Sequence, residues 1–205
     1  MRTPLILTYT AAACLFGLPA AANNPPRARV NAESGINLTI VVSQSGSVPQ
    51  QVREVAQRTV SVLFHRIGIE IRYTNDPSQT NPDAIALHIC EHAPKRFGPL
   101  VLGSAWLGNG RSREANAYYD RVALFSTTSN EREIGILFGY AIAHELGHVL
   151  LAQAGHSADG IMKSSWTRTD ARFMLIGIAS FTRAEADRMV DGLEARRLVA
   201  TSGVQ

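Results

Sequence analysis

Residues 143–151 read Ala-His-Glu-Leu-Gly-His-Val-Leu-Leu, and this stretch decides the fold. Apolar residues precede and follow its polar side chains, a pattern that predicts a long, largely buried helix from about residue 130 to residue 153. On a helix, His144 and His148 lie one turn apart on one face, whereas Glu145 is rotated from His144 by about 100°. Because burial of two imidazoles and a carboxylate without partners is unfavourable, these side chains require a partner such as a metal ion.

Two histidines one helical turn apart can share a single zinc ion at nitrogen–metal distances of about 2.0–2.1 Å. The pattern therefore predicts that His144 and His148 bind Zn²⁺. Glu145 faces elsewhere, so we expect it to activate a zinc-bound water as a general base rather than to bind the ion. An ordinary surface helix carrying the same residues is the alternative, which the apolar neighbours disfavour.

A catalytic zinc ion usually has three protein ligands. We expect the third to be His156, which follows Gly155 and lies eight residues beyond His148. A continued helix would carry His156 about 12 Å along its axis, so the chain has to leave the helix and turn back. Gly155 is expected to adopt the left-handed conformation that ends helices. Asp159 and Glu185 are the alternative third ligands.

The motif His-Glu-Leu-Gly-His at residues 144–148, followed by His156-Ser157 and Met162, resembles the metzincin zinc peptidases, and among them the matrixins. The resemblance covers roughly residues 100–162. It implies that the three histidines bind zinc and that the glutamate of the motif activates water. It also implies that Met162 lies in a methionine-containing turn beneath the metal without binding it.

The spacing of the third histidine departs from that family. Metzincins place it six residues after the second histidine, whereas here the separation is eight. The glycine that the family has in this linker would fall at Leu151. We therefore expect the helix to run half a turn longer or the following loop to bulge by two residues.

The remaining elements indicate an α+β fold: a mixed twisted sheet of about five strands with the long active-site helix and a C-terminal helix, metzincin-like by the resemblance. Alternating or β-branched segments predict strands, and periodic apolar residues with capping signals predict helices. By the resemblance, the strand near residues 100–107 would align an extended peptide substrate through its backbone. Three helices are expected to start near Pro49, near residue 130 and at Thr182, where Glu185 completes a capping box. The expected strands are residues 38–42, 69–73, 84–89, 100–107 and 115–125. Residues 155–170 are expected to be irregular.

The N-terminus predicts export. An apolar run from Leu5 to Leu18, after a positively charged start and before small residues, predicts a signal peptide over residues 1–22. The run is shorter than the ~20 residues that a membrane-spanning helix needs, so we expect a periplasmic or extracellular protein without a membrane anchor. A lipoprotein anchor at Cys14 is a weaker alternative. Residues 23–36 are expected to form a flexible lead, and residues 37–205 the zinc metallopeptidase domain.

The composition narrows the function classes. The chain has 205 residues, a formal net charge of +3 and 45% hydrophobic residues, which is typical of one globular domain. Its basic residues form no cluster, so no nucleic-acid partner is expected. Without the signal peptide, Cys90 is alone and no intramolecular disulfide can form. His88, Cys90 and His92 alternate along an expected strand and are a weaker candidate for a second metal site.

Together these observations predict a secreted zinc-dependent endopeptidase that acts on peptide or protein substrates. Two other functions fit the same residues. One is a zinc-binding interaction protein with weak turnover, which the intact Glu145 disfavours because a binding protein has no use for that carboxylate. The other is a zinc amidase that acts on cell-wall peptides. The sequence predicts no oligomeric state.

Overall fold

The computed structural model describes residues 36–79, 83–107, 113–126 and 128–202, all of which belong to one compact unit, Gly35–Gln205. The predicted signal peptide and all but the last residue of the predicted lead lie outside the described residues. The domain boundaries drawn from the sequence therefore stay predictions.

Five strands form one mixed sheet. They are β1 (Ile36–Ser45), β2 (Ile69–Thr74), β3 (Ile85–Cys90), β4 (Gly103–Trp106) and β5 (Glu114–Tyr118), in the spatial order β2-β1-β3-β5-β4. All neighbouring pairs are parallel except β4 with β5, which are antiparallel and place β4 at one edge. The predicted α+β class and five-stranded mixed sheet are confirmed.

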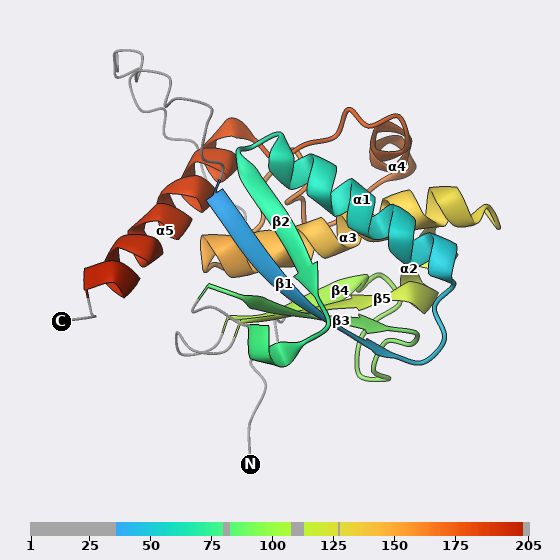
Figure 1. The fold of residues 1–205 in the computed structure, drawn as a ribbon. Helices are drawn as coiled ribbons and strands as arrows, with labels where there is room; N and C mark the ends of the chain where they lie inside the picture. The colour runs from blue at the N-terminus through green and yellow to red at the C-terminus, as the bar shows by residue number, and fades with distance from the viewer. Residues whose placement is uncertain (1–35, 80–82, 108–112, 127, 203–205) are drawn as a thin grey trace, which may run out of the picture. The chain divides into compact units, whose positions relative to one another are not determined.

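Two helices, α1 (Gln50–His65) and α3 (Glu131–Leu151), pack against each other on one face of this sheet, as Figure 1 shows. The expected helix starts are confirmed. α1 begins after Pro49, and the Asn130 side chain caps α3 by accepting hydrogen bonds from two backbone N–H groups. Gly135 and Gly139 of α3 let the helices approach closely, because a Cβ atom there would lie 2.7 Å from Val55 Cβ and 2.6 Å from Thr59 Cβ.

The single strand predicted over residues 115–125 is wrong in its second half. β5 ends at Tyr118, and α2 (Tyr119–Ser126) starts directly after it. Just past the strand, the Asp120 backbone N–H donates to Glu91 O, and the Asp120 carboxylate accepts from the N–H groups of Ala93 and Arg121. The contacts with Glu91 and Ala93 come from a segment almost 30 residues earlier in the chain, so no local pattern predicts them.

The region after the third histidine is less irregular than predicted. α4 (Arg168–Leu175) begins inside it, at a capping box formed by Thr167 and Asp170. The capping box of Thr182 and Glu185, predicted from the sequence, is confirmed by two hydrogen bonds, and α5 (Arg183–Ser202) follows it.

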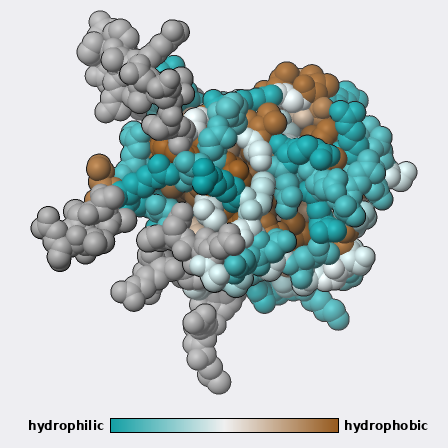
Figure 2. Space-filling model, in the orientation of Figure 1, coloured by the Kyte–Doolittle hydropathy of each residue, from teal (hydrophilic) through white to brown (hydrophobic). Residues whose placement is uncertain are grey.

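The apolar side chains of α3 are buried in the core of the domain. Among the described residues, α3 is the one helix long and apolar enough to span a membrane by length and composition, with a mean hydropathy of 1.5, but 89% of that window is buried within the fold. In Figure 2 hydrophilic residues cover most of the visible face, and hydrophobic residues appear among them in several places, including the upper right. Phe173 of α4 and the following Ile176 and Ile178 are exposed.

Candidate metal centre

Three histidines converge at the C-terminal half of α3. His144 and His148 come from the helix, and His156 comes from the loop that follows it. One nitrogen atom from each ring lies within 4.8 Å of the other two. His148 is buried, His144 is half-buried and His156 is exposed, so the cluster lies where the core meets solvent. The structure thus brings together the three predicted ligands.

Two of the histidine rings donate hydrogen bonds to backbone carbonyl groups. His144 Nδ1 lies 2.9 Å from Ile161 O, and His148 Nδ1 lies 2.9 Å from Gln153 O. A carbonyl oxygen only accepts, so both Nδ1 atoms carry the proton and both Nε2 atoms present a lone pair.

These two Nε2 atoms face each other 3.0 Å apart. Two lone pairs at this distance repel, and no hydrogen bond can form between two neutral rings in these tautomers. A cation between them removes the repulsion, and two nitrogen ligands of a tetrahedral zinc ion are about 3.3 Å apart. The donor set and its spacing therefore fit Zn²⁺.

The electrostatics keep the cluster neutral. Burial lowers the pKa of His144 to about 3, with its neighbouring histidines adding to the effect and the hydrogen bond to Ile161 opposing it. Burial also lowers the pKa values of His148 and His156 below their usual range. The imidazoles are thus unprotonated at neutral pH, which is the state that binds a metal.

Glu145 lies beside the histidines, under the edge strand. Its side chain is buried, and no described residue donates a hydrogen bond to its carboxylate. It packs against Gly103 of β4, where a Cβ atom would lie 2.6 Å from Glu145 Cγ. Burial raises the pKa of Glu145 to about 8, whereas a nearby divalent cation favours the ionised form. Glu145 is therefore a buried carboxylate that has no hydrogen-bond donor among the described residues, and it lies beside a histidine cluster that could hold a metal ion.

Sequence reasoning missed the role of Gly103. Its signal was the glycine itself, since a glycine inside a strand often marks a close approach of another group to the backbone. Trp166 was also missed. Its ring meets His144 edge-on at 5.6 Å, and its Nε1 donates to Ile161 O, which also accepts from His144. Only the aromatic residue type hinted at a contact of this kind.

Met162 is buried against α3, at the helix surface next to the cluster. Its side chain is 1% exposed, and a Cβ atom at Gly147 would lie 2.5 Å from Met162 Sδ and 3.3 Å from a ring carbon of Phe181. This is the packing expected of a methionine beneath the metal. That role stays a prediction.

Replacing Gly147 with alanine is expected to destabilise the protein by about 1–3 kcal/mol, because the added methyl group overpacks this contact. Chemical denaturation measures the effect. Gly192→Ala in α5 is the control, since its Cβ atom would have no neighbour closer than 3.8 Å and alanine favours helix. Equal stability of Gly147→Ala and wild type would contradict the close packing of Met162.

The two additional residues between His148 and His156 lie in the loop that follows α3. α3 ends at Leu151, and Ala152 rather than Gly155 has the left-handed conformation, with φ 50° and ψ 37°. The expectation for Gly155 is wrong, since its φ lies outside that region. The physical reason is that the Ala152 N–H donates to Val149 O and the Gln153 N–H donates to His148 O, so the helix is capped at Ala152, directly after Leu151. Of the two expected solutions, the longer loop is therefore the one found.

Ala152→Gly is expected to raise the free energy of unfolding by about 1 kcal/mol, because glycine adopts the left-handed conformation without a Cβ clash. Gly155→Ala is expected to be neutral or mildly stabilising, as a Cβ atom there meets nothing within 4 Å. Thermal unfolding of both variants tests the assignment. The reverse order of stability would place the helix cap at Gly155.

The other candidates from the sequence are not brought to the cluster. Among the described residues, Asp159 is exposed and outside it, and Glu185 is engaged with Ser157 and Thr182. The possible second metal site is not assembled. His88 pairs with Ser43, and His92 lies near Glu91 and Asp120, while Cys90 contacts the His88 carbonyl.

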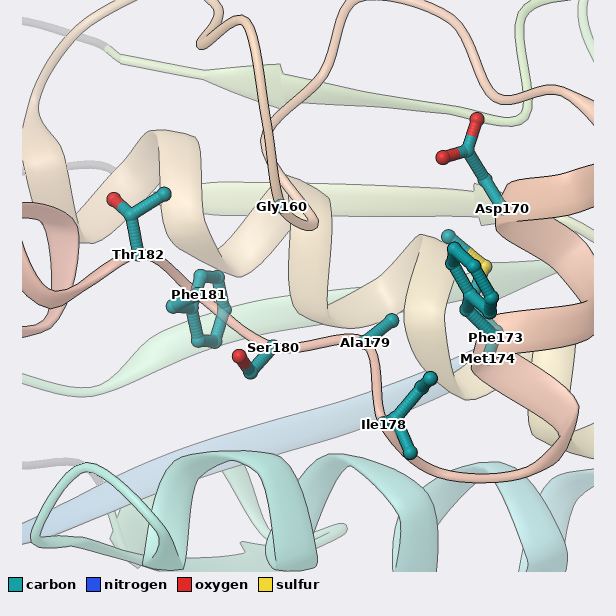
Figure 3. Close-up of a pocket in the computed structure, with 9 residues that line it drawn as sticks. All are labelled: Gly160, Asp170, Phe173, Met174, Ile178, Ala179, Ser180, Phe181 and Thr182. Atoms are coloured by element: carbon teal, nitrogen blue, oxygen red, sulfur yellow. The ribbon is translucent and has the colours of Figure 1, made fainter.

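A pocket of about 320 Å³ lies apart from the histidines, between α4 and the segment that leads to α5 (Figure 3). Asp170 at its rim is held by Lys163 at 2.8 Å, so its charge is already compensated. The remaining lining is formed by Gly160, Phe173, Met174, Ile178, Ala179, Ser180, Phe181 and Thr182. None of the three clustered histidines lines this pocket.

Solved structures with a similar fold include zinc-dependent peptidases. A zinc-dependent peptidase from Methanocorpusculum labreanum is similar with a TM-score of 0.52 and 12% identity, over 76% of this chain and 100% of that one. An archaemetzincin from Methanopyrus kandleri has a TM-score of 0.49 and 18% identity, over 80% and 99% of the two chains. No protein-family model and no curated protein matches the sequence. The first similarity shows that this chain shares the fold of a zinc-dependent peptidase.

Proposed function

We propose that this protein is a zinc metallopeptidase, a hydrolase that acts on peptide bonds. The observation that carries the proposal is the pair of Nε2 lone pairs facing each other at 3.0 Å, joined by His156 and flanked by the unpartnered carboxylate of Glu145. The fold shared with a zinc-dependent peptidase supports it.

His144, His148 and His156 would hold the ion, which leaves a coordination position open for substrate and water. When bound, zinc supplies Lewis acidity, which lowers the pKa of water and polarises a carbonyl group. Glu145 accepts the proton of the attacking water as the new carbon–oxygen bond forms. It returns this proton to the amine nitrogen as the carbon–nitrogen bond breaks. Among the described residues, no donor forms a hydrogen bond with its carboxylate, so both oxygens are available for these transfers.

The edge strand supports an endopeptidase with an extended substrate. β4 pairs with β5 on one side, and among the described strands it has no partner on the other. An extended peptide can add to such an edge through backbone hydrogen bonds. Gly103 of β4 packs on Glu145, so a peptide bound along this strand passes close to the general base.

The finer assignment that we propose is a metzincin of the matrixin type, exported through the signal peptide at residues 1–22. The order of His156, Ser157 and Met162 supports the first part, and the N-terminal pattern supports the second. Mass spectrometry of protein from the native host tests export, with a mature N-terminus at Asn23 as the expected result. An intact N-terminus in the cytoplasm, or a lipid on Cys14, would contradict it.

Metal analysis together with hydrolysis assays tests the proposed activity. The expected result is one zinc ion per chain, cleavage of internal bonds in a peptide library, loss of cleavage after treatment with a chelator, and recovery after zinc is restored. Cleavage of cell-wall peptides alone would identify the amidase instead. Tight zinc binding without hydrolysis of either substrate set would favour the zinc-binding interaction protein.

A further inference from the structure

The three histidines are not held equally well. Carbonyl groups orient the rings of His144 and His148, whereas no described residue forms a hydrogen bond with the His156 ring. The backbone next to His156 is open, because Gly155 is exposed, has no regular secondary structure, and a Cβ atom there would meet nothing within 4 Å. Something other than the ring and the preceding loop has to fix the position of His156.

Ser157, the residue after His156, supplies that anchor. Its backbone N–H donates to Met162 O at 2.8 Å, and its hydroxyl group donates to Glu185 Oε1. Glu185 is 4% exposed, and its other oxygen accepts from the Thr182 N–H at 2.7 Å. Both oxygens of this buried carboxylate are therefore used, one to cap α5 and one to hold the residue beside His156.

A second contact from α5 reaches the support of His148. Arg188 Nη2 donates to Gln153 Oε1 at 2.7 Å, and the backbone carbonyl of Gln153 accepts from His148 Nδ1. Further along α5, Arg196 Nη2 donates to Leu150 O at the end of α3. One face of α5 thus contacts the end of the metal-binding helix and both ends of the loop that leads to His156.

We propose that α5 is a brace for the metal centre and that Glu185 and Arg188 are positioning residues for the ligands His156 and His148. The proposal rests on the zinc centre proposed above. Glu185 acts through the Ser157 hydroxyl group and Arg188 acts through Gln153, so neither residue touches the ion. The brace fixes an exposed ligand on a loop that has little packing of its own.

The cost of an unbraced ligand is a loss of metal affinity. Partners that orient a metal ligand typically contribute 10- to 100-fold to affinity, because an unrestrained ligand loses conformational freedom when it binds. Ser157→Ala removes the hydroxyl group and leaves both the histidine and the helix cap of Glu185 in place. We therefore expect Ser157→Ala to weaken zinc binding by roughly 10- to 100-fold, with one ion still bound at saturation.

The matched control is Thr182→Ala. It removes the hydroxyl group that accepts from the Glu185 N–H, but the Thr182 backbone N–H and Ser157 can still donate to the Glu185 carboxylate. Helix capping is weakened and the tether is kept, so zinc affinity should stay within about twofold of wild type. Competition with a chromophoric chelator measures the affinities of the full-length variants.

Cobalt spectra separate positioning from general loss of structure. The d–d absorption of bound Co²⁺ reports ligand geometry. It should change in Ser157→Ala, return in Ser157→Thr, which restores a hydroxyl group, and stay unchanged in Thr182→Ala. Arg188→Ala should give a smaller loss of zinc affinity than Ser157→Ala. Arg183→Ala should give none, since the Arg183 side chain is 93% exposed and pairs with Asp187, one turn along α5.

The outcomes distinguish this inference from the proposed function. Wild-type zinc affinity and an unchanged cobalt spectrum in Ser157→Ala would overturn the brace while the zinc centre stands. An equal loss of affinity in Thr182→Ala would also overturn it, because helix capping alone would then explain the effect. Failure of the wild-type protein to bind zinc would overturn both.

Discussion

Glu145→Gln is expected to lower the rate of peptide hydrolysis by about 10²- to 10⁴-fold while the protein keeps one zinc ion per chain. Glutamine has nearly the same shape as glutamate, so it fits the space beneath Gly103, but it cannot accept a proton at neutral pH. The carboxylate is absent from the group of atoms that converges on the metal position, so its loss leaves the ligands intact. The substitution therefore removes the base and spares the metal.

Kinetics and metal analysis on the same sample measure this result. Glu131→Gln is the matched control, because Glu131 is an exposed carboxylate in the first turn of the same helix. It should leave both hydrolysis and zinc content unchanged. Loss of zinc in Glu145→Gln would make Glu145 a ligand, and full activity with zinc retained would remove it from the mechanism.

The part of the site that lies on α3 could be predicted from the sequence. The separation of His144 and His148 by one helical turn is a local property, and the surrounding apolar residues indicate that the helix is buried. The same holds for the strands of the sheet, apart from the end of β5, and for the capping box of Thr182 and Glu185, since each depends on residues close together in the chain.

What the sequence did not predict depends on distant contacts. Beyond the end of β5 at Tyr118, Asp120 donates to Glu91 O and accepts from the Ala93 N–H, and both partners lie in a segment distant in sequence. The left-handed residue before His156 is Ala152, where the intrinsic preference of glycine pointed to Gly155. The pairing of Ser157 with Glu185 joins two segments 28 residues apart in sequence, so no local pattern marks it.

The role of Glu185 shows how such a contact changes an interpretation. From the sequence it was a rival third ligand, because a carboxylate can bind zinc. In the structure both of its oxygens are engaged, by Ser157 and by Thr182. Glu185 therefore lies near the metal site because it supports the loop that carries His156, and not because it binds the ion.

His156→Ala is expected to abolish stoichiometric zinc binding, with a loss of affinity greater than the roughly 100-fold that loss of an orienting partner causes. His156 completes the three-histidine group, and the remaining pair on α3 offers only two nitrogen donors. Because the His156 side chain is exposed, its removal should leave the metal-free fold as stable as wild type. Loss of zinc would then reflect the missing ligand rather than unfolding.

Asp159→Ala is the matched control on the same loop. Asp159 is exposed and is not part of the histidine group, so this variant should keep one zinc ion and wild-type hydrolysis. Thermal unfolding separates the two variants, since zinc at 100 times its dissociation constant stabilises the native state by about 2.7 kcal/mol. This shift should be present in wild type and Asp159→Ala and absent in His156→Ala. The opposite pattern would make Asp159 the third ligand, and the resemblance to metzincins would then lose the residue that most distinguishes it.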